Sequence, residues 1–162
     1  MSLDAPPAAP SLLVRKSIRV NASPARAFEV FATQMTRWWP LGTHHIGRAE
    51  AAEAVVEPFV GGRWYERGVD GSECDWGRVL AYEPPGRLVL AWMISADWQF
   101  SASLHTEVEV TFVPDGTGTR VELEHRKLEA YGARAAELQG TLGGQGGWTN
   151  LLAAFGAAMD AG

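Results

Sequence analysis

Residues 105–127 read HTEVEVTFVPDGTGTRVELEHRK, and this stretch decides the fold because it holds two strands and the loop between them. In its first half Val110 and Phe112 alternate with polar residues, and in its second half Val121 and Leu123 do the same. A period of two is typical of a strand that buries one face. The intervening Pro-Asp-Gly-Thr-Gly supplies turn residues. The stretch therefore predicts an antiparallel hairpin with one apolar face.

More strands precede this hairpin, and helices stand at both ends of the series. Together with the hairpin, the expected strands are 14–20, 51–57, 63–67, 74–82, 88–93, 105–113 and 120–127. A Ser-Pro pair predicts a helix start, so we expect helices at 24–35 and 130–142, and a last one in which Trp148, Leu152, Phe155 and Met159 share one stripe. This order favours an α+β fold, with an antiparallel sheet of about six or seven strands packed on a C-terminal helix.

The chain of 162 residues is expected to form one domain with a short arm in front of it. Pro6, Pro7 and Pro10 disfavour both helix and strand, so residues 1–13 are interpreted as a flexible arm. Residues 14–162 are then the single domain. Because 46% of its residues are apolar, the chain has enough hydrophobic side chains to form a core.

Charge and cysteine content exclude several classes of function. The net charge is −5 and no window clusters cations, so a nucleic acid is a poor partner. The single cysteine, Cys74, cannot form an intramolecular disulfide bond. The first dozen residues do not resemble a signal peptide, and the apolar stretch 151–159 is too short to span a bilayer. We therefore expect a cytoplasmic protein without a membrane span.

Several short motifs carry a family resemblance. They are Ser23-Pro24, Trp38-Trp39, Gly61-Gly62-Arg63-Trp64, Gly77-Arg78-Val79, Glu83-Pro84-Pro85-Gly86-Arg87-Leu88 and Gly147-Trp148. In this order and spacing the chain resembles the SRPBCC (START-like) superfamily, and within it the bacterial homologues of the heat-shock-protein-90 ATPase activator. The resemblance covers residues 14–159.

The resemblance implies a helix-grip fold, in which a curved antiparallel sheet wraps a long C-terminal helix and leaves an apolar cavity. Members of the superfamily include lipid carriers, hormone binders, polyketide cyclases and ring-hydroxylase subunits, so the fold alone does not select an activity. The branch also implies a chaperone as a partner. This is weakened because the eukaryotic co-chaperones carry an additional N-terminal domain, whereas here only about a dozen residues precede the first strand.

The seven tryptophans are the main candidates for a ligand site. The strand phases place Trp64 on one face with Glu66, Trp76 with Cys74 and Arg78, and Trp92 with Leu88 and Leu90. The expected cavity or rim residues are Trp38, Trp39, Trp64, Trp76, Trp92, Trp98 and Trp148, with Leu152 and Phe155 from the last helix. These rings either fill a core or line a pocket, and the pattern leaves both open.

The histidines are the next candidates. His125 is in phase with the apolar side of its strand, where it either orients a ligand and acts as a base or bonds to core groups. His44 and His45 follow Trp39 in a segment interpreted either as a gate at the cavity mouth or as a surface loop. Adjacent histidines in a strand point to opposite faces, and no third ligand has zinc-like spacing, so we expect no metal and no cofactor.

Arg63 and Glu66 belong to the same strand in opposite phase, so only one of them can face the interior. The sequence does not decide which. No nucleophile elbow, phosphate loop or metalloprotease motif is present, and the acidic neighbours of Cys74 disfavour a reactive thiolate. No catalytic residue is assigned.

Three functions remain. The first is binding of a hydrophobic or aromatic small molecule in the cavity. The second is a cyclase- or hydrolase-like enzyme with a histidine, His125 or His44, as general acid or base. The third is a regulatory module that acts on a chaperone. A homodimer is also compatible with the sequence.

Overall fold

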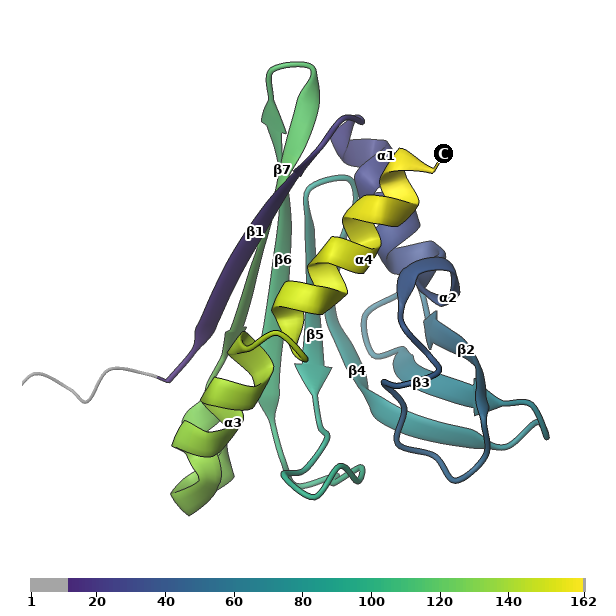
Figure 1. Cartoon of the computed structure of the whole chain (residues 1–162), viewed down its shortest axis with the longest axis vertical. Helices are drawn as coiled ribbons and strands as arrows, with labels where there is room; N and C mark the ends of the chain where they lie inside the picture. Colours follow the sequence, from purple (N-terminus) through teal and green to yellow (C-terminus); the bar gives the residue numbers. More distant parts are fainter. Residues whose placement is uncertain (1–11, 162) are drawn as a thin grey trace, which may run out of the picture.

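The computed structural model describes residues 12–161. Over these residues seven strands form one antiparallel sheet in the spatial order β1-β7-β6-β5-β4-β3-β2. Their bounds are β1 Val14–Val20, β2 Ala51–Val56, β3 Arg63–Gly68, β4 Glu73–Glu83, β5 Arg87–Trp92, β6 Thr106–Asp115 and β7 Gly118–Arg126. The sheet curls around the C-terminal helix (Figure 1), which confirms the α+β helix-grip fold.

The predicted helix over 24–35 is present in three pieces. The Ser23 hydroxyl oxygen accepts a hydrogen bond from the Arg26 amide at 3.2 Å and caps α1 (Pro24–Phe28). A π-helical turn, η1 (Glu29–Thr33), and a last turn, α2 (Met35–Trp38), continue the same path. Together they cover one end of the sheet beside the C-terminal helix (Figure 1).

After β7, the regular α-helix begins later in the chain than the sequence predicts. A 3-10 segment, η2 (Leu128–Arg134), precedes α3 (Ala135–Gly143), whereas the pattern predicts a regular helix from residue 130. Gly132 explains the difference, because its φ of 62° lies in the left-handed region, which an α-helix does not contain. The long final helix is α4 (Trp148–Asp160).

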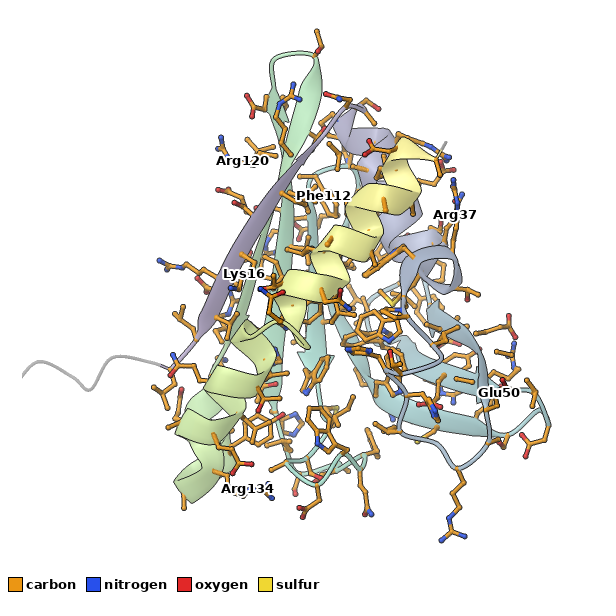
Figure 2. The ribbon with its side chains drawn as sticks, in the orientation of Figure 1. Lys16, Arg37, Glu50, Phe112, Arg120 and Arg134 are labelled. Atoms are coloured by element: carbon orange, nitrogen blue, oxygen red, sulfur yellow. The ribbon has the colours of Figure 1, made fainter. Side chains whose placement is uncertain are left out.

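The interior lies between α4 and the concave face of the sheet. Gly156 allows α4 to approach β1, since a Cβ at this position would lie 2.6 Å from the Ile18 side chain. Phe155 on α4 makes edge-to-face ring contacts with Phe31 and Trp38. Figure 2 shows Phe112 beside α4, and its ring contacts that of Phe31.

A β-bulge in β4 changes which side chains face the interior. The register passes from Trp64 opposite Gly77 to Tyr65 opposite Asp75, which leaves Trp76 unpaired. Trp76 and Gly77 are both buried, whereas Arg78 is partly exposed and donates to the Asp75 carboxylate at 3.0 Å. The expectation that Trp76 and Arg78 share a face is therefore wrong, because the bulge resets the alternation.

The predicted N-terminal arm, residues 1–13, lies outside the described residues except for its last two. Both of these are held by the fold: the Leu12 carbonyl accepts from the Leu128 amide at 3.2 Å, and the Leu13 carbonyl accepts from the Gln139 side chain at 2.9 Å. Leu12 and Leu13 therefore contact the folded part of the chain. Within residues 12–161, no helix is long and apolar enough to cross a membrane.

Candidate functional site

A cavity of about 450 Å³ lies between the loop after α2, the end of β5 and the junction of α3 with α4. Four tryptophans form much of its wall: Trp39, Trp76, Trp92 and Trp98. In Figure 2, Glu50 marks the end of the loop after α2. Small-molecule sites generally measure about 300–1,000 Å³. The cavity is therefore large enough for a compact organic ligand.

The indole wall has a buried part and an exposed part. Trp39 and Trp76 contact each other with ring centroids 5.0 Å apart and planes tilted by 39°, and they are buried together with Trp92. Trp98 is 44% exposed and has a φ of 61°, an unusual value for a residue with a side chain. Its loop is tied to η2 by the ion pair of Asp97 with Arg134 at 2.8 Å. Trp98 is thus the rim residue of the four.

The remaining sequence-predicted aromatic and aliphatic site residues form a second layer behind this wall. Trp64 supports it directly, with ring centroids 5.5 Å from Trp76 and 5.6 Å from Trp92. The residues of this layer are all buried and do not line the cavity: Trp38, Trp64, Trp148, Leu152 and Phe155. The two interpretations of the tryptophans therefore apply to different rings, since some fill the core and others line the cavity.

His125 belongs to the core layer and is fully buried. The Trp148 indole N–H donates to His125 Nδ1 at 3.0 Å, so in the neutral ring Nε2 carries the proton and donates to the Thr106 hydroxyl at 2.9 Å. That hydroxyl donates in turn to the Trp92 carbonyl at 2.8 Å. Burial lowers the pKa of His125 to about 3. Both nitrogens are occupied, so of the two alternatives left open by the sequence the hydrogen bonds favour the neutral core histidine.

The loop between α2 and β2 carries His44 and His45 into the cavity wall together. Adjacent histidines lie on opposite faces in a strand, as the sequence predicts, but this segment is a loop. His44 Nε2 donates to the Gly146 carbonyl at 2.7 Å, and the Thr43 hydroxyl donates to Nδ1 at 2.7 Å. His44 therefore fastens this loop to the glycine linker before α4, across the cavity.

Glu66, and not Arg63, faces the interior. Its side chain is 2% exposed, and its Oε1 accepts from the Ile46 amide at 2.6 Å and from the Trp76 indole at 2.8 Å. Its Oε2 has no hydrogen-bond partner among the described residues and lies 3.8 Å from His45 Nδ1. Glu66 thus holds the histidine loop against the indole wall and leaves one buried oxygen beside His45.

Arg63 lies on the outer face of the sheet. It binds Asp75 at 2.7 Å and Glu73 at 3.0 Å, and these contacts raise its pKa. The pKa of Cys74 is also raised, first by burial and then by the charges of Glu66 and Asp75. This agrees with the expectation of an unreactive thiol, although Glu73 does not contribute, because it pairs with arginines.

The aliphatic part of the lining was not predicted from the sequence, and it includes Ile46, Ile94, Leu142 and Leu151. No motif marks these residues, and only the ends of helices and strands bring them together. The Trp92 indole N–H is a second buried polar atom that has no hydrogen-bond partner among the described residues. Burial raises the pKa of the nearby Tyr131 hydroxyl, which donates to the Ile94 carbonyl at 2.6 Å, to about 12.

Other parts of the surface are less suited to binding a small molecule. A hollow of about 460 Å³ lies on the outer face near β1, β6 and β7, but charged side chains line it, and they form ion pairs such as Arg15 with Glu124 at 2.8 Å. Across the described part of the chain, no group of three or more His, Cys, Asp or Glu side chains is close enough to hold a metal ion.

Comparison with known proteins assigns the family. The model of the family described as Activator of Hsp90 ATPase homolog 1-like protein matches residues 21–160. The chain belongs to this family. The match confirms the resemblance to the SRPBCC superfamily. A search of curated proteins gave no significant match.

Solved structures resemble the chain over nearly its whole length. Txn09, described as an anthrahydroquino-γ-pyrone synthase complexed with SUM, is 43% identical, with 90% of this chain and 96% of Txn09 covered and a TM-score of 0.63. CalC from Micromonospora echinospora, a self-sacrificing resistance protein, is 30% identical, with 92% and 94% covered and a TM-score of 0.68. Protein NE0264 from Nitrosomonas europaea, at 12% identity, 93% and 95% coverage and a TM-score of 0.67, supports the fold alone.

Proposed function

We propose that the protein binds a planar aromatic small molecule in the cavity between the sheet and the helices α3 and α4. The observation that carries this proposal is the indole wall, in which Trp39, Trp76, Trp92 and Trp98 border one space of about 450 Å³. Indole rings offer large flat apolar surfaces, and aromatic pairs contribute about 0.5–1.5 kcal/mol beyond their buried area. A flat ligand therefore makes more contact with these rings than a flexible aliphatic molecule does.

One relative supports an aromatic ligand. Txn09 is named for an anthrahydroquino-γ-pyrone, which is a fused aromatic ring system, and it is 43% identical to the present chain. By that analogy we take anthraquinones as the first ligand class to test.

Binding is measured by quenching of tryptophan fluorescence and by calorimetry, with anthraquinone, flavone and fatty-acid probes. The Trp98→Ala variant is expected to weaken anthraquinone binding by about 3- to 10-fold, the loss of one aromatic contact. Phe59→Ala is the matched control, because Phe59 is 55% exposed and is absent from the cavity lining. Absence of binding for the whole panel, or equal effects of the two variants, contradicts the proposal.

A second candidate is a ring-forming enzyme, and the identity to Txn09 favours it. In this case the chain closes a γ-pyrone on a bound anthrahydroquinone. Incubation with an anthrahydroquinone that carries an uncyclised side chain, followed by liquid chromatography and mass spectrometry, tests this. Product formation no faster than in buffer alone rejects the enzyme and leaves the binding protein.

The partner and compartment expected from the sequence complete the proposal. We expect binding to take place in the cytoplasm, because the single cysteine, Cys74, is free. A chaperone partner and a homodimer stay predictions, which pull-down with the cognate chaperone and sedimentation analysis address.

A further inference from the structure

We propose that His45, with the Glu66 carboxylate beside it, accepts the proton of a phenolic hydroxyl group on the aromatic ligand. This inference rests on the proposed function and specifies it, since it selects phenolic aromatic molecules. The site consists of the His45 imidazole in the cavity wall and the Glu66 carboxylate behind it.

Hydrogen bonding assigns the two nitrogens of His45. Nδ1 lies 3.1 Å from the Gly47 carbonyl oxygen, which can only accept, so Nδ1 carries the proton in the neutral ring. Nε2 is then an unprotonated nitrogen, and it makes no hydrogen bond with any described residue. The side chain is 27% exposed and lines the cavity, so Nε2 is available to a ligand.

Glu66 supplies the charge that stabilises the protonated ring. Its side chain is 2% exposed, and its unpartnered Oε2 lies 3.8 Å from Nδ1. An opposite charge within about 4–6 Å favours the charged form of an ionisable group. The position of Glu66 is fixed by the two donors on Oε1, the Ile46 amide and the Trp76 indole. Glu66 therefore acts on the ligand through the charge that it places beside His45, whereas the Gly47 carbonyl holds the ring by its hydrogen bond to Nδ1.

The proton transfer balances without another reactant. The phenol O–H bond breaks, its electron pair stays on the oxygen, and a new N–H bond forms at His45 Nε2. The products are a phenolate and an imidazolium between the phenolate and the Glu66 carboxylate. On release of the ligand the proton returns to the phenolate oxygen.

Other titratable groups near the pair are already occupied. His44 uses both ring nitrogens, with Thr43 and the Gly146 carbonyl. The Cys74 thiol has a raised pKa because it is buried near Glu66. On the opposite rim Asp97 is bound to Arg134. His45 is thus the base that the cavity offers to a ligand.

The sign of a pKa shift tests the proposal. An apolar cavity alone raises the pKa of a bound phenol, whereas an adjacent imidazolium lowers it by about one to three units. The probe is 2-hydroxyanthraquinone, whose phenolate absorbs at longer wavelength than the phenol, and it is titrated with protein in excess. We expect the wild-type protein to lower the pKa of the bound probe by at least about one unit, a tenfold change in the proton equilibrium.

Variants separate the roles of the two residues. His45→Gln should abolish the lowering of the probe pKa, and Glu66→Gln should reduce it while keeping an oxygen for the two Oε1 donors. His105→Gln is the matched control, because His105 is exposed and does not line the cavity, and it should keep the lowering. A raised or unchanged pKa in the wild-type protein, or an equal loss in His105→Gln, overturns the proposal.

Binding is scored separately with unsubstituted anthraquinone, which has no proton to give. If neither probe binds, the proposed function fails. If both bind and the phenol pKa is not lowered, only the proton acceptor fails.

Discussion

Replacement of His125 by Gln should remove a specific dependence of stability on pH. In the folded protein the imidazole is fully buried, and the pKa is lowered to about 3 from an ordinary value of 6.5. The unfolded chain therefore binds a proton at His125 at a pH where the folded chain does not. Stability from the neutral ring is complete above the unfolded pKa and is lost as the pH falls toward the folded one.

The size of the effect follows from linkage. Each pH unit between the two pKa values changes the free energy of unfolding by about 1.4 kcal/mol per proton. At about pH 4.5, two units below the unfolded value, His125 alone destabilises the wild-type protein by about 3 kcal/mol. Gln does not titrate, but its amide can accept from the Trp148 indole and donate to the Thr106 hydroxyl, so the fold is kept.

The assay is urea denaturation of both proteins at about pH 7 and about pH 4.5, followed by tryptophan fluorescence. Carboxylates titrate in both proteins, so the difference between the proteins isolates His125. At neutral pH the wild-type protein should be more stable, and the gap should shrink by about 3 kcal/mol in acid. A gap that stays constant would refute the assignment of a neutral, buried imidazole.

Three further substitutions test the packing and the hydrogen bond to His125. Gly77→Ala should lower the free energy of unfolding by about 3 kcal/mol or more, because the added Cβ collides with the Ala91 carbonyl oxygen. Gly140→Ala is the control, since Gly140 lies on the open surface of a helix, and it should be neutral or stabilising. Thermal denaturation of both variants measures the difference. Trp148→Phe removes the indole N–H that His125 accepts and should cost about 1–3 kcal/mol. In a double-mutant cycle with His125→Gln the two effects should not add, and additive effects would contradict the hydrogen bond.

Alternation of apolar and polar residues was enough to predict the sheet. The hairpin of β6 and β7 carries a strict period of two, and the structure pairs Val110 with Leu123 and Phe112 with Val121 as that pattern requires. The bulge at Trp76 was not predictable, because an extra residue in a strand has no fixed composition and appears only when the partner strand is known.

The sequence also predicted only part of the candidate site, because the rest depends on tertiary contacts. The sequence identified the residue types of the wall, but it could not divide the rings between wall and core, which depends on how α4 lies across the sheet. It also left Arg63 and Glu66 undecided, since phase alone excludes one of them without naming it. The pairing of Glu66 with a loop twenty residues earlier, at Ile46, is a tertiary contact with no local pattern.

The layered arrangement of the tryptophans has a consequence for the entropy of binding. Trp39 and Trp76 are already fixed by neighbouring rings such as Trp64, at centroid distances of 5.0–6.1 Å. A ligand that meets these rings does not need to freeze their rotamers, so little side-chain entropy is lost. Trp98 is exposed at the rim, so its side chain is the one that loses conformational entropy when a ligand binds. Shape selection should therefore come from the preorganised inner rings, and the residence time of a ligand from Trp98.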